Sequence, residues 1–204
     1  MAELNNDKPF SQACENNQEP IFNILKDVFS DKTSILEIGS GTGQHAVYMA
    51  PRMAHLQWQT SDLSENAKGI NRWINDEQAA NVLRPLELDI AKHWPNPDLV
   101  SNFDGLYSAN TCHIMPWETV QSFLAGMESM QEGSRLAIYG PFKYGGDYTS
   151  ESNERFDHWL KAQEAHRGIR DFEAVAELAN KSGFDLLKDH KMPANNQLLI
   201  WQKR

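Results

Sequence analysis

The sequence predicts an α/β fold, with helices on both faces of a mostly parallel sheet that contains one antiparallel strand. Strand-like apolar segments alternate with helix-like segments along most of the 204 residues, which is typical of this class. Several strand segments have continuous apolar centres, as strands buried on both faces do. The last two strand segments are joined by the short turn PANN, which predicts a hairpin and hence the antiparallel strand.

The expected elements follow from hydrophobic spacing. Residues 1–19 are polar and rich in asparagine, so we expect them to be irregular. A helix is expected from Glu19–Pro20, because proline suits a first helical turn and apolar residues then recur at helical spacing. The expected strands are 33–39, 56–62, 84–90, 103–110, 134–142, 185–192 and 196–204. Further helices are expected at 43–53, at 64–79 with Ser64 as N-cap, at 116–130 and at 171–184.

The alternation breaks at residues 143–170, which are long, polar and aromatic. Within them Phe156 and Trp159 have helical spacing, which predicts a short helix. A connection of this length in a compact domain is usually a lid or a binding segment. We therefore predict one domain over 1–204, with 1–34 as an N-terminal cap segment and helix and 143–170 as an insertion that covers the cleft.

Composition excludes several classes of protein. The net charge is −9, and an acidic chain repels phosphate backbones, so no nucleic-acid partner is expected. No apolar run reaches the length needed to cross a bilayer, and the N-terminus lacks an apolar signal core. Two cysteines without metal-ligand spacing predict reduced thiols, no metal and a cytoplasmic location. Nothing in the sequence selects an oligomeric state.

The stretch ILEIGSGTGQHA directly follows a buried strand. It lacks the Gly-Lys-Ser/Thr ending of a phosphate-binding loop and the third glycine position of the dinucleotide fingerprint. Its pattern is E-x-G-x-G-x-G, formed by Glu37, Gly39, Gly41 and Gly43, with Ser40 inside it. A ligand without phosphate needs the glycines only for close approach, and S-adenosyl-L-methionine is such a ligand, with a cationic tail that suits an acidic neighbour.

Polar residues at further strand ends support the same site. Asp62 follows the glycines at the distance expected for a ribose acceptor, and Asp89 and Asn110 end the next two strands. Leu63 and Ile90 adjoin them. Structural alternatives remain for three of these residues: Glu37 could bond the loop backbone, Asp62 could cap a helix, and Asp89 could only form a turn.

The motifs LEIGSGTGQHAVYMA, WQTSDLSE, LELDI and SANTCHIMPW resemble those of class I S-adenosylmethionine-dependent methyltransferases. Over nearly its whole length, including FSQACENNQEPI, YGPFKYGG and SNERFDHWL, the chain resembles the methyltransferase-like family named domain of unknown function 938. The resemblance implies a Rossmann-like, seven-stranded fold with an antiparallel last strand. It also implies cofactor contacts at Glu37, Gly39, Gly41, Asp62 and Asp89, and it supplies no substrate.

The predicted function is methyl transfer from S-adenosylmethionine to a small-molecule substrate. The fourth strand lacks the Asn/Asp-Pro-Pro-Tyr/Phe sequence of many enzymes that methylate bases and glutamines. A base is needed only if the acceptor carries a proton. His113 is the candidate, with a satisfied structural histidine as the other reading. Alternatives are a non-catalytic cofactor-binding protein and an NAD-dependent oxidoreductase, although no Tyr-x-x-x-Lys pair is suitably placed.

We expect the acceptor site to form between the N-terminal segment, the turn after the fifth strand and the 143–170 insertion. In the alternative reading, the aromatic residues of the insertion only dock it to the body. The candidate substrate-binding residues are Asn16, Asn17, Tyr139, Phe142, Tyr144, Arg155 and Trp159.

Overall fold

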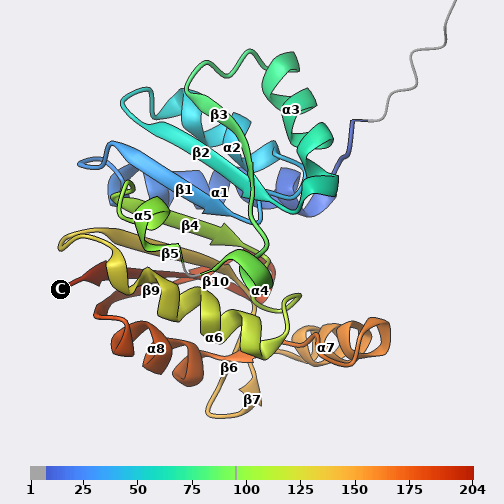
Figure 1. The fold of residues 1–204 in the computed structure, drawn as a ribbon. Helices are drawn as coiled ribbons and strands as arrows, with labels where there is room; N and C mark the ends of the chain where they lie inside the picture. The colour runs from blue at the N-terminus through green and yellow to red at the C-terminus, as the bar shows by residue number, and fades with distance from the viewer. Residues whose placement is uncertain (1–7, 95) are drawn as a thin grey trace, which may run out of the picture.

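A seven-stranded sheet forms the centre of the computed structural model, which describes residues 8–94 and 96–204 (Figure 1). Its strand order is β3-β2-β1-β4-β5-β10-β9. Neighbouring strands are parallel except at β10, which is antiparallel to both β5 and β9. The predicted hairpin and the predicted fold class are therefore confirmed. The strands of this sheet are β1 Ser34–Ile38, β2 Gln57–Asp62, β3 Val82–Glu87, β4 Gly105–Ala109, β5 Arg135–Gly140, β9 Phe184–Met192 and β10 Asn196–Lys203.

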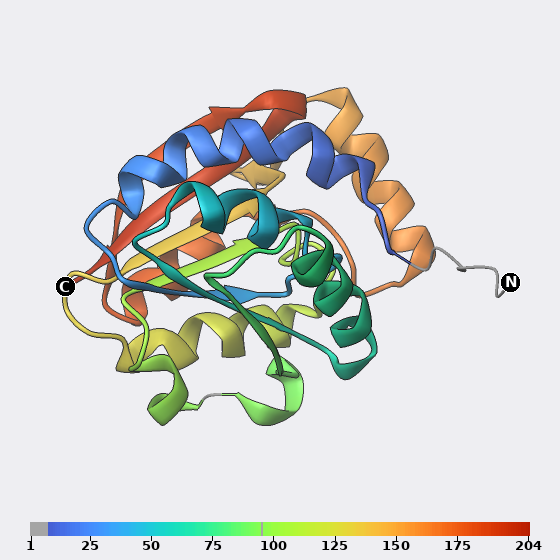
Figure 2. The same ribbon diagram turned by 90° about the horizontal axis from the view of Figure 1, so that it is seen from above.

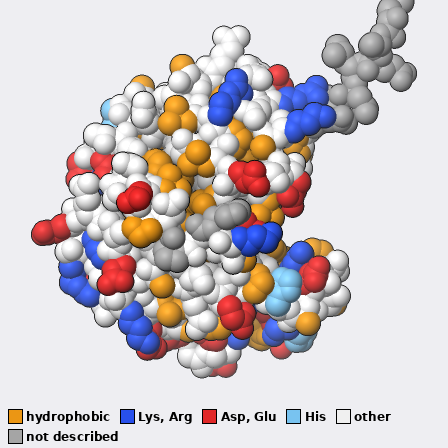
Figure 3. Space-filling view, in the orientation of Figure 1, with side chains coloured by type: hydrophobic (Ala, Val, Ile, Leu, Met, Phe, Trp, Pro, Cys, Tyr) orange, Lys and Arg blue, Asp and Glu red, His pale blue; other side chains and the backbone are white. Residues whose placement is uncertain are grey.

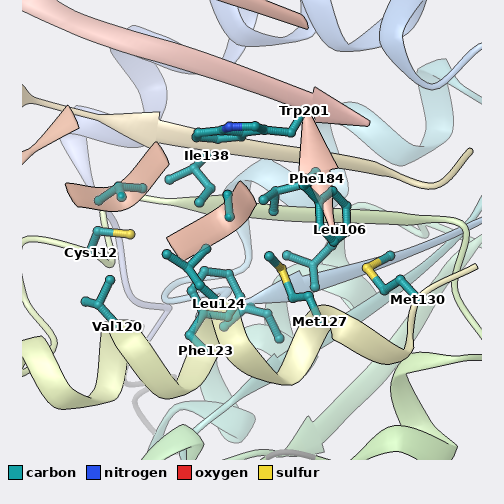
Figure 4. Close-up of a cluster of buried hydrophobic side chains, with 14 of the residues drawn as sticks. Leu106, Cys112, Val120, Phe123, Leu124, Met127, Met130, Ile138, Phe184 and Trp201 are labelled. Atoms are coloured by element: carbon teal, nitrogen blue, oxygen red, sulfur yellow. The ribbon is translucent and has the colours of Figure 1, made fainter. Parts of the chain in front are cut away.

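Helices cover both faces of this sheet (Figure 2). One face carries α1 Gln12–Val28, α2 Gln44–Met49 and α3 Ala67–Asp76. The other carries α4 Ile90–His93, α5 Pro97–Val100, α6 Trp117–Ala125 and α8 Phe172–Lys181. Each face has its own buried apolar cluster. Figure 4 shows the second, in which side chains of α6 pack against Leu106, Ile138 and Trp201 of the sheet.

The side chains of β1 point alternately to the two faces of the sheet, which explains how an acidic residue comes to lie in a core. Leu36 and Ile38 join the cluster under α6, whereas Ile35 joins the cluster under α1–α3. Successive side chains of a strand point to opposite faces, so Glu37 shares the α1–α3 face with Ile35. It is 2% exposed there. The strand therefore holds the carboxyl of Glu37 beneath the glycine-rich loop that follows.

The first helix begins earlier than the sequence predicted. It starts at Gln12, where Ser11 is the N-cap and its side chain accepts from the Cys14 N–H, and Pro20 lies inside the helix. The prediction of irregular chain up to residue 19 is thus wrong for the residues from Gln12 on, and residues 1–7 of the expected N-terminal cap lie outside the described residues. Burial of the apolar face of α1 outweighs the hydrogen bond that an internal proline removes.

The predicted strand 134–142 is in fact two strands. β5 ends at Gly140, and after Pro141 the chain enters a small three-stranded sheet in which β6 lies between β7 and β8. Proline supplies no N–H for a ladder, which accounts for the break. The bounds of these strands and of the helix between them are β6 Phe142–Tyr144, β7 Asp147–Tyr148, α7 Glu151–Gln163 and β8 Arg170–Asp171.

The insertion is tied down by one carboxylate. Asp157, fully buried on α7, accepts from the Tyr148 hydroxyl (2.7 Å) and the Ile169 N–H (2.6 Å) and pairs with Lys161 (2.6 Å). Burial alone would raise the pKa of Asp157, but these hydrogen bonds outweigh it and lower that pKa. The predicted helix in this segment is confirmed, and its start at Ser150 is a side-chain N-cap.

Two other boundaries differ from prediction. The third strand ends at Glu87, so residues 88–90 form a loop and the start of α4. Ser64 is not an N-cap, because it begins a short 3₁₀ turn ahead of α3. In both places a polar residue expected to mark a regular element instead lies in the turn at the edge of the sheet.

Candidate functional site

A cavity of about 580 Å³ lies at the carboxyl ends of β1, β2 and β4, the edge where ligands bind in open α/β sheets. It lies within the size range of small-molecule sites. Nine of the ten residues predicted to hold a cofactor line it. They are Glu37, Gly39, Ser40, Gly41, Asp62, Leu63, Asp89, Ile90 and Asn110.

The glycine-rich loop is held against the end of β2. The N–H groups of Gly39 and Ser40 both donate to the Ser61 carbonyl, at 3.1 and 2.9 Å. Gly39 has φ +71, and a Cβ added there would lie 2.6 Å from the Thr111 side chain. Gly41 has φ +58, and a Cβ there would meet nothing within 4 Å. The loop therefore needs glycine at Gly39 for both conformation and space, while Gly41 leaves the backbone open to the cavity.

Gly43 is the predicted residue that does not line the cavity. It has φ +89 and is the N-cap of α2. A Cβ there would lie 3.1 Å from the Ile70 Cα. Its role in the structure is thus to start α2 and to let that helix approach α3.

The Glu37 carboxyl lines the cavity from below. Its Oε2 accepts from the Ser40 hydroxyl (2.9 Å) and from the Trp58 indole N–H (3.1 Å). Burial raises the pKa of Glu37 to about 7, and these two hydrogen bonds act in the opposite direction. Near neutral pH this carboxyl can therefore exchange a proton, and a cationic group placed in the cavity would favour its ionised form.

Asp62 joins the glycine loop to the turn after β2. Its Oδ2 accepts from the Gly41 N–H (2.6 Å), and its Oδ1 accepts from the Leu63 N–H (2.7 Å) and the Asn66 side chain (2.8 Å). The alternative role of Asp62 as a helix cap is not what the structure shows. Its carboxylate lies between the loop and the cavity, where further donors could reach it.

Asp89 both caps a helix and lines the cavity. It is the N-cap of α4, accepts from the Ala91 N–H (2.9 Å) and forms an ion pair with Lys92 (2.8 Å). Ile90 follows it and is buried. Asn110 ends β4 with φ +58, a conformation uncommon outside glycine that asparagine tolerates better than most residues.

Sequence reasoning missed several lining residues. They include Ser11, Cys14 and Asn66, and two residues of the insertion, His166 and Arg167. The last two had a signal, since the insertion was expected to cover the cleft. Ser11 and Cys14 belong to the N-terminal segment, which was expected to border the neighbouring acceptor site, but the early start of the helix that carries Cys14 was not predicted.

A buried polar chain runs from this cavity toward a second one. The Tyr107 hydroxyl lies 3.1 Å from His45 Nδ1, and His45 Nε2 lies 2.7 Å from Asn17 Oδ1. Burial lowers the pKa of His45 to about 4 and raises that of Tyr107 well above its usual value. The ring is thus neutral and the phenol protonated. Burial raises the pKa of Tyr139, and the side chains of Asn17 and Asn196 act in the opposite direction.

The second cavity, of about 420 Å³, lies between α1, α7 and the β9–β10 turn. Asn110 lines both cavities, so they adjoin there. Of the residues predicted for substrate, Asn16, Asn17 and Tyr139 line this cavity. Asn153 and Phe156, which also line it, belong to the 143–170 insertion that was expected to border the acceptor site, whereas the turn residues 193–196 were not predicted.

The other predicted substrate residues lie elsewhere. Phe142 is buried in the α6-side core, and the Tyr144 hydroxyl donates to Asp189 (2.6 Å) in a separate hollow. Arg155 is exposed and pairs with Glu151 of its own helix. Trp159 is 55% exposed and stacks on Phe156. Helical spacing could not tell which face of α7 turns inward.

His113 also lies outside both sets of lining residues. It is 5% exposed, and its ring packs edge-on against Phe156, with centroids 5.5 Å apart. Burial lowers its pKa to about 4, with Arg170 and Arg167 acting in the same direction. The structure therefore gives His113 the surroundings of a packed, neutral histidine, as in the structural reading.

The described residues contain no group of His, Cys, Asp and Glu side chains placed to hold a metal ion. Among them, no helix has the length and apolar character of a membrane span. On the face shown in Figure 3, basic side chains are interspersed with acidic ones and do not gather in one patch. The same face is hollowed between α7 and the body of the molecule.

Several solved structures with the same fold are methyltransferases. An O-methyltransferase family protein from Burkholderia thailandensis superimposes with a TM-score of 0.79 at 14% identity, covering 94% of this chain and 57% of that one. Human N-acetylserotonin methyltransferase in complex with SAM superimposes with a TM-score of 0.76 at 15% identity, covering 94% of this chain and 53% of that one. The N,N-8-amino-8-demethyl-D-riboflavin dimethyltransferase RosA from Streptomyces davawensis has a TM-score of 0.74 and 14% identity, and the match covers 95% of this chain and 55% of that one. The chain spans little more than half the length of these proteins, and at such identities the likeness establishes the fold.

A family model identifies the chain more narrowly. The model described as protein of unknown function (DUF938) matches residues 8–203. Because this match covers nearly the whole sequence, including both cavities, the chain belongs to the DUF938 family, on a class I methyltransferase fold.

Proposed function

We propose that this protein is an S-adenosylmethionine-dependent methyltransferase that acts on a small molecule. The observation that carries the proposal is the pair of adjoining cavities. One is bordered by the glycine loop, Glu37 and Asp62, and the other is bordered by α1, α7 and the β9–β10 turn. A group-transfer enzyme needs two such sites in contact, and Asn110 lies at their junction.

The residues of the first cavity fit S-adenosylmethionine. Gly41 leaves room for close approach to the backbone, Asp62 supplies a carboxylate for hydroxyl donors, and Glu37 supplies a carboxyl near a cationic tail. The sulfonium of the cofactor supplies an already activated methyl group. The protein's part is therefore to align the two molecules and exclude water. His166 and Arg167 of the insertion contribute by closing the cavity over the loop.

Binding of the demethylated product, S-adenosylhomocysteine, tests the proposal by calorimetry, with NAD as the comparison ligand. Asp62→Asn removes the charge but keeps an acceptor for the Gly41 N–H, and affinity should fall about tenfold because charged hydrogen bonds are the stronger ones. Asp98→Asn, which changes an exposed residue outside the cavity, is the control. An unchanged affinity in Asp62→Asn, or tight NAD binding, would contradict the assignment.

Catalysis itself is tested separately from binding. Incubation with labelled S-adenosylmethionine and fractionated small-molecule extracts should transfer label to a product below the size of a protein. A protein that binds the cofactor and transfers no label to any fraction would favour the non-catalytic alternative. The proposal places the enzyme in the cytoplasm, as its two free cysteines suggest, and without a nucleic-acid partner, which a mobility-shift assay at low salt tests most severely.

A further inference from the structure

The second cavity has a wall without a formal charge. Its lining residues include no Lys, Arg, Asp or Glu, and polar atoms come from six asparagines, one serine and Tyr139. The remaining wall is apolar, from alanine, proline and Phe156. The neighbouring hollow beside β9 differs, because Asp147, Asp189 and Lys191 line it.

Asn17 presents a donor to this cavity. It is 7% exposed, and its Oδ1 is occupied by His45 Nε2. Because the Asn17 Oδ1 can only accept, the proton of the neutral His45 ring is on Nε2, and Nδ1 accepts from the Tyr107 hydroxyl. The end of the Asn17 amide left for a ligand is therefore Nδ2, which can only donate.

Asn153 presents an acceptor. It is 5% exposed, and Nδ2 donates to both Thr149 Oγ1 (2.9 Å) and the Asn195 carbonyl (2.9 Å). Both of its side-chain protons are thus used. No described residue donates to its Oδ1, which leaves that atom as the one Asn153 offers to the cavity. The Asn195 carbonyl belongs to the β9–β10 turn, so this bond also joins α7 to the hairpin.

We propose that the second cavity takes an uncharged methyl acceptor with an amide-like edge, meaning a carbonyl-type acceptor beside an N–H donor. The carbonyl faces Asn17 Nδ2 and the N–H faces Asn153 Oδ1, while the apolar body packs against Phe156. This inference rests on the proposed function and adds the chemical class of its substrate. A carboxylate or an ammonium would enter without a counter-charge, and burying an unpaired charge is strongly unfavourable.

Three fragments of one shape test the class: 4-fluorobenzamide, 4-fluorobenzoate and 4-fluorobenzamidinium. They are neutral, anionic and cationic in turn, and each is titrated by ¹⁹F NMR into the protein with and without S-adenosylhomocysteine. We expect the neutral amide to bind at least about tenfold more tightly than either ion. The ranking on the unchanged protein is a test that requires no variant.

Asn17→Asp then locates the contact. It replaces the donor by a carboxylate of the same shape. The affinity for 4-fluorobenzamide should therefore fall about tenfold and the affinity for 4-fluorobenzamidinium should rise about tenfold, which reverses their order. Asn23→Asp makes the same change further along α1, at an exposed position that lines neither cavity, and should leave the order unchanged.

The proposal is overturned if no fragment binds, if an ion binds as tightly as the amide, or if the order survives Asn17→Asp. The calorimetric titration of S-adenosylhomocysteine reports on the first cavity independently. Failure there with a correct fragment ranking would remove the methyltransferase assignment and leave the second cavity's chemistry standing. Binding of S-adenosylhomocysteine together with the wrong fragment ranking would overturn the substrate class and leave the methyltransferase assignment standing.

Discussion

Replacing Glu37 by glutamine should remove a pH dependence of stability. In the unfolded chain this carboxyl ionises near pH 4.5, whereas burial keeps it protonated in the fold up to about pH 7. Between these values the folded state binds more protons, so the free energy of unfolding falls as pH rises. At ~1.4 kcal/mol per pH unit, the loss is about 3 kcal/mol, complete above pH 7.

Glutamine is a close match for the protonated side chain. Both hydrogen bonds that Glu37 accepts, from Ser40 and Trp58, reach the same oxygen, Oε2, and the amide oxygen can accept both. The variant should therefore match the wild type near pH 4.5 and exceed it by about 3 kcal/mol at pH 8. Urea unfolding at several pH values measures this difference directly, and groups that titrate in both proteins cancel.

Glu132→Gln, at an exposed position, should show no such trend. A difference between Glu37→Gln and wild type that stays constant from pH 4.5 to 8 would refute the reasoning. It would mean that Glu37 is ionised in the fold at low pH, and that the cavity is better solvated than its geometry indicates.

Three further outcomes are expected. Gly39→Ala should destabilise more than Gly41→Ala in urea unfolding, because both have positive φ but only the first places a Cβ against a neighbour; equal losses would contradict this. Asp157→Asn should speed proteolysis within 143–170 and leave the rest of the chain intact, since the buried carboxylate ties that segment down. Phe123→Ala should cost about 3–5 kcal/mol, whereas Phe10→Ala, at a residue 59% exposed, should cost little.

The sequence by itself determined the sheet and most of the first cavity. Apolar runs predict the parallel strands, and the PANN turn predicts the antiparallel hairpin, whereas the strand order came from the structure. Parallel strands deliver their carboxyl ends to one edge, so residues at those ends, such as Glu37 and Asp62, meet without knowledge of any side-chain contact. Local chemistry and topology suffice there because backbone geometry does the positioning.

Segments around the second cavity were predictable from the sequence, but only the tertiary structure decided which of their side chains line it. α1 begins at Gln12 with a proline inside it, because packing outweighs propensity, and this places Asn17 against His45. Which face of α7 turns inward depends on the Asp157 anchor, so Asn153 enters the cavity while Arg155 faces solvent. Contacts between residues far apart in the chain set these orientations, and spacing along one helix carries no record of them.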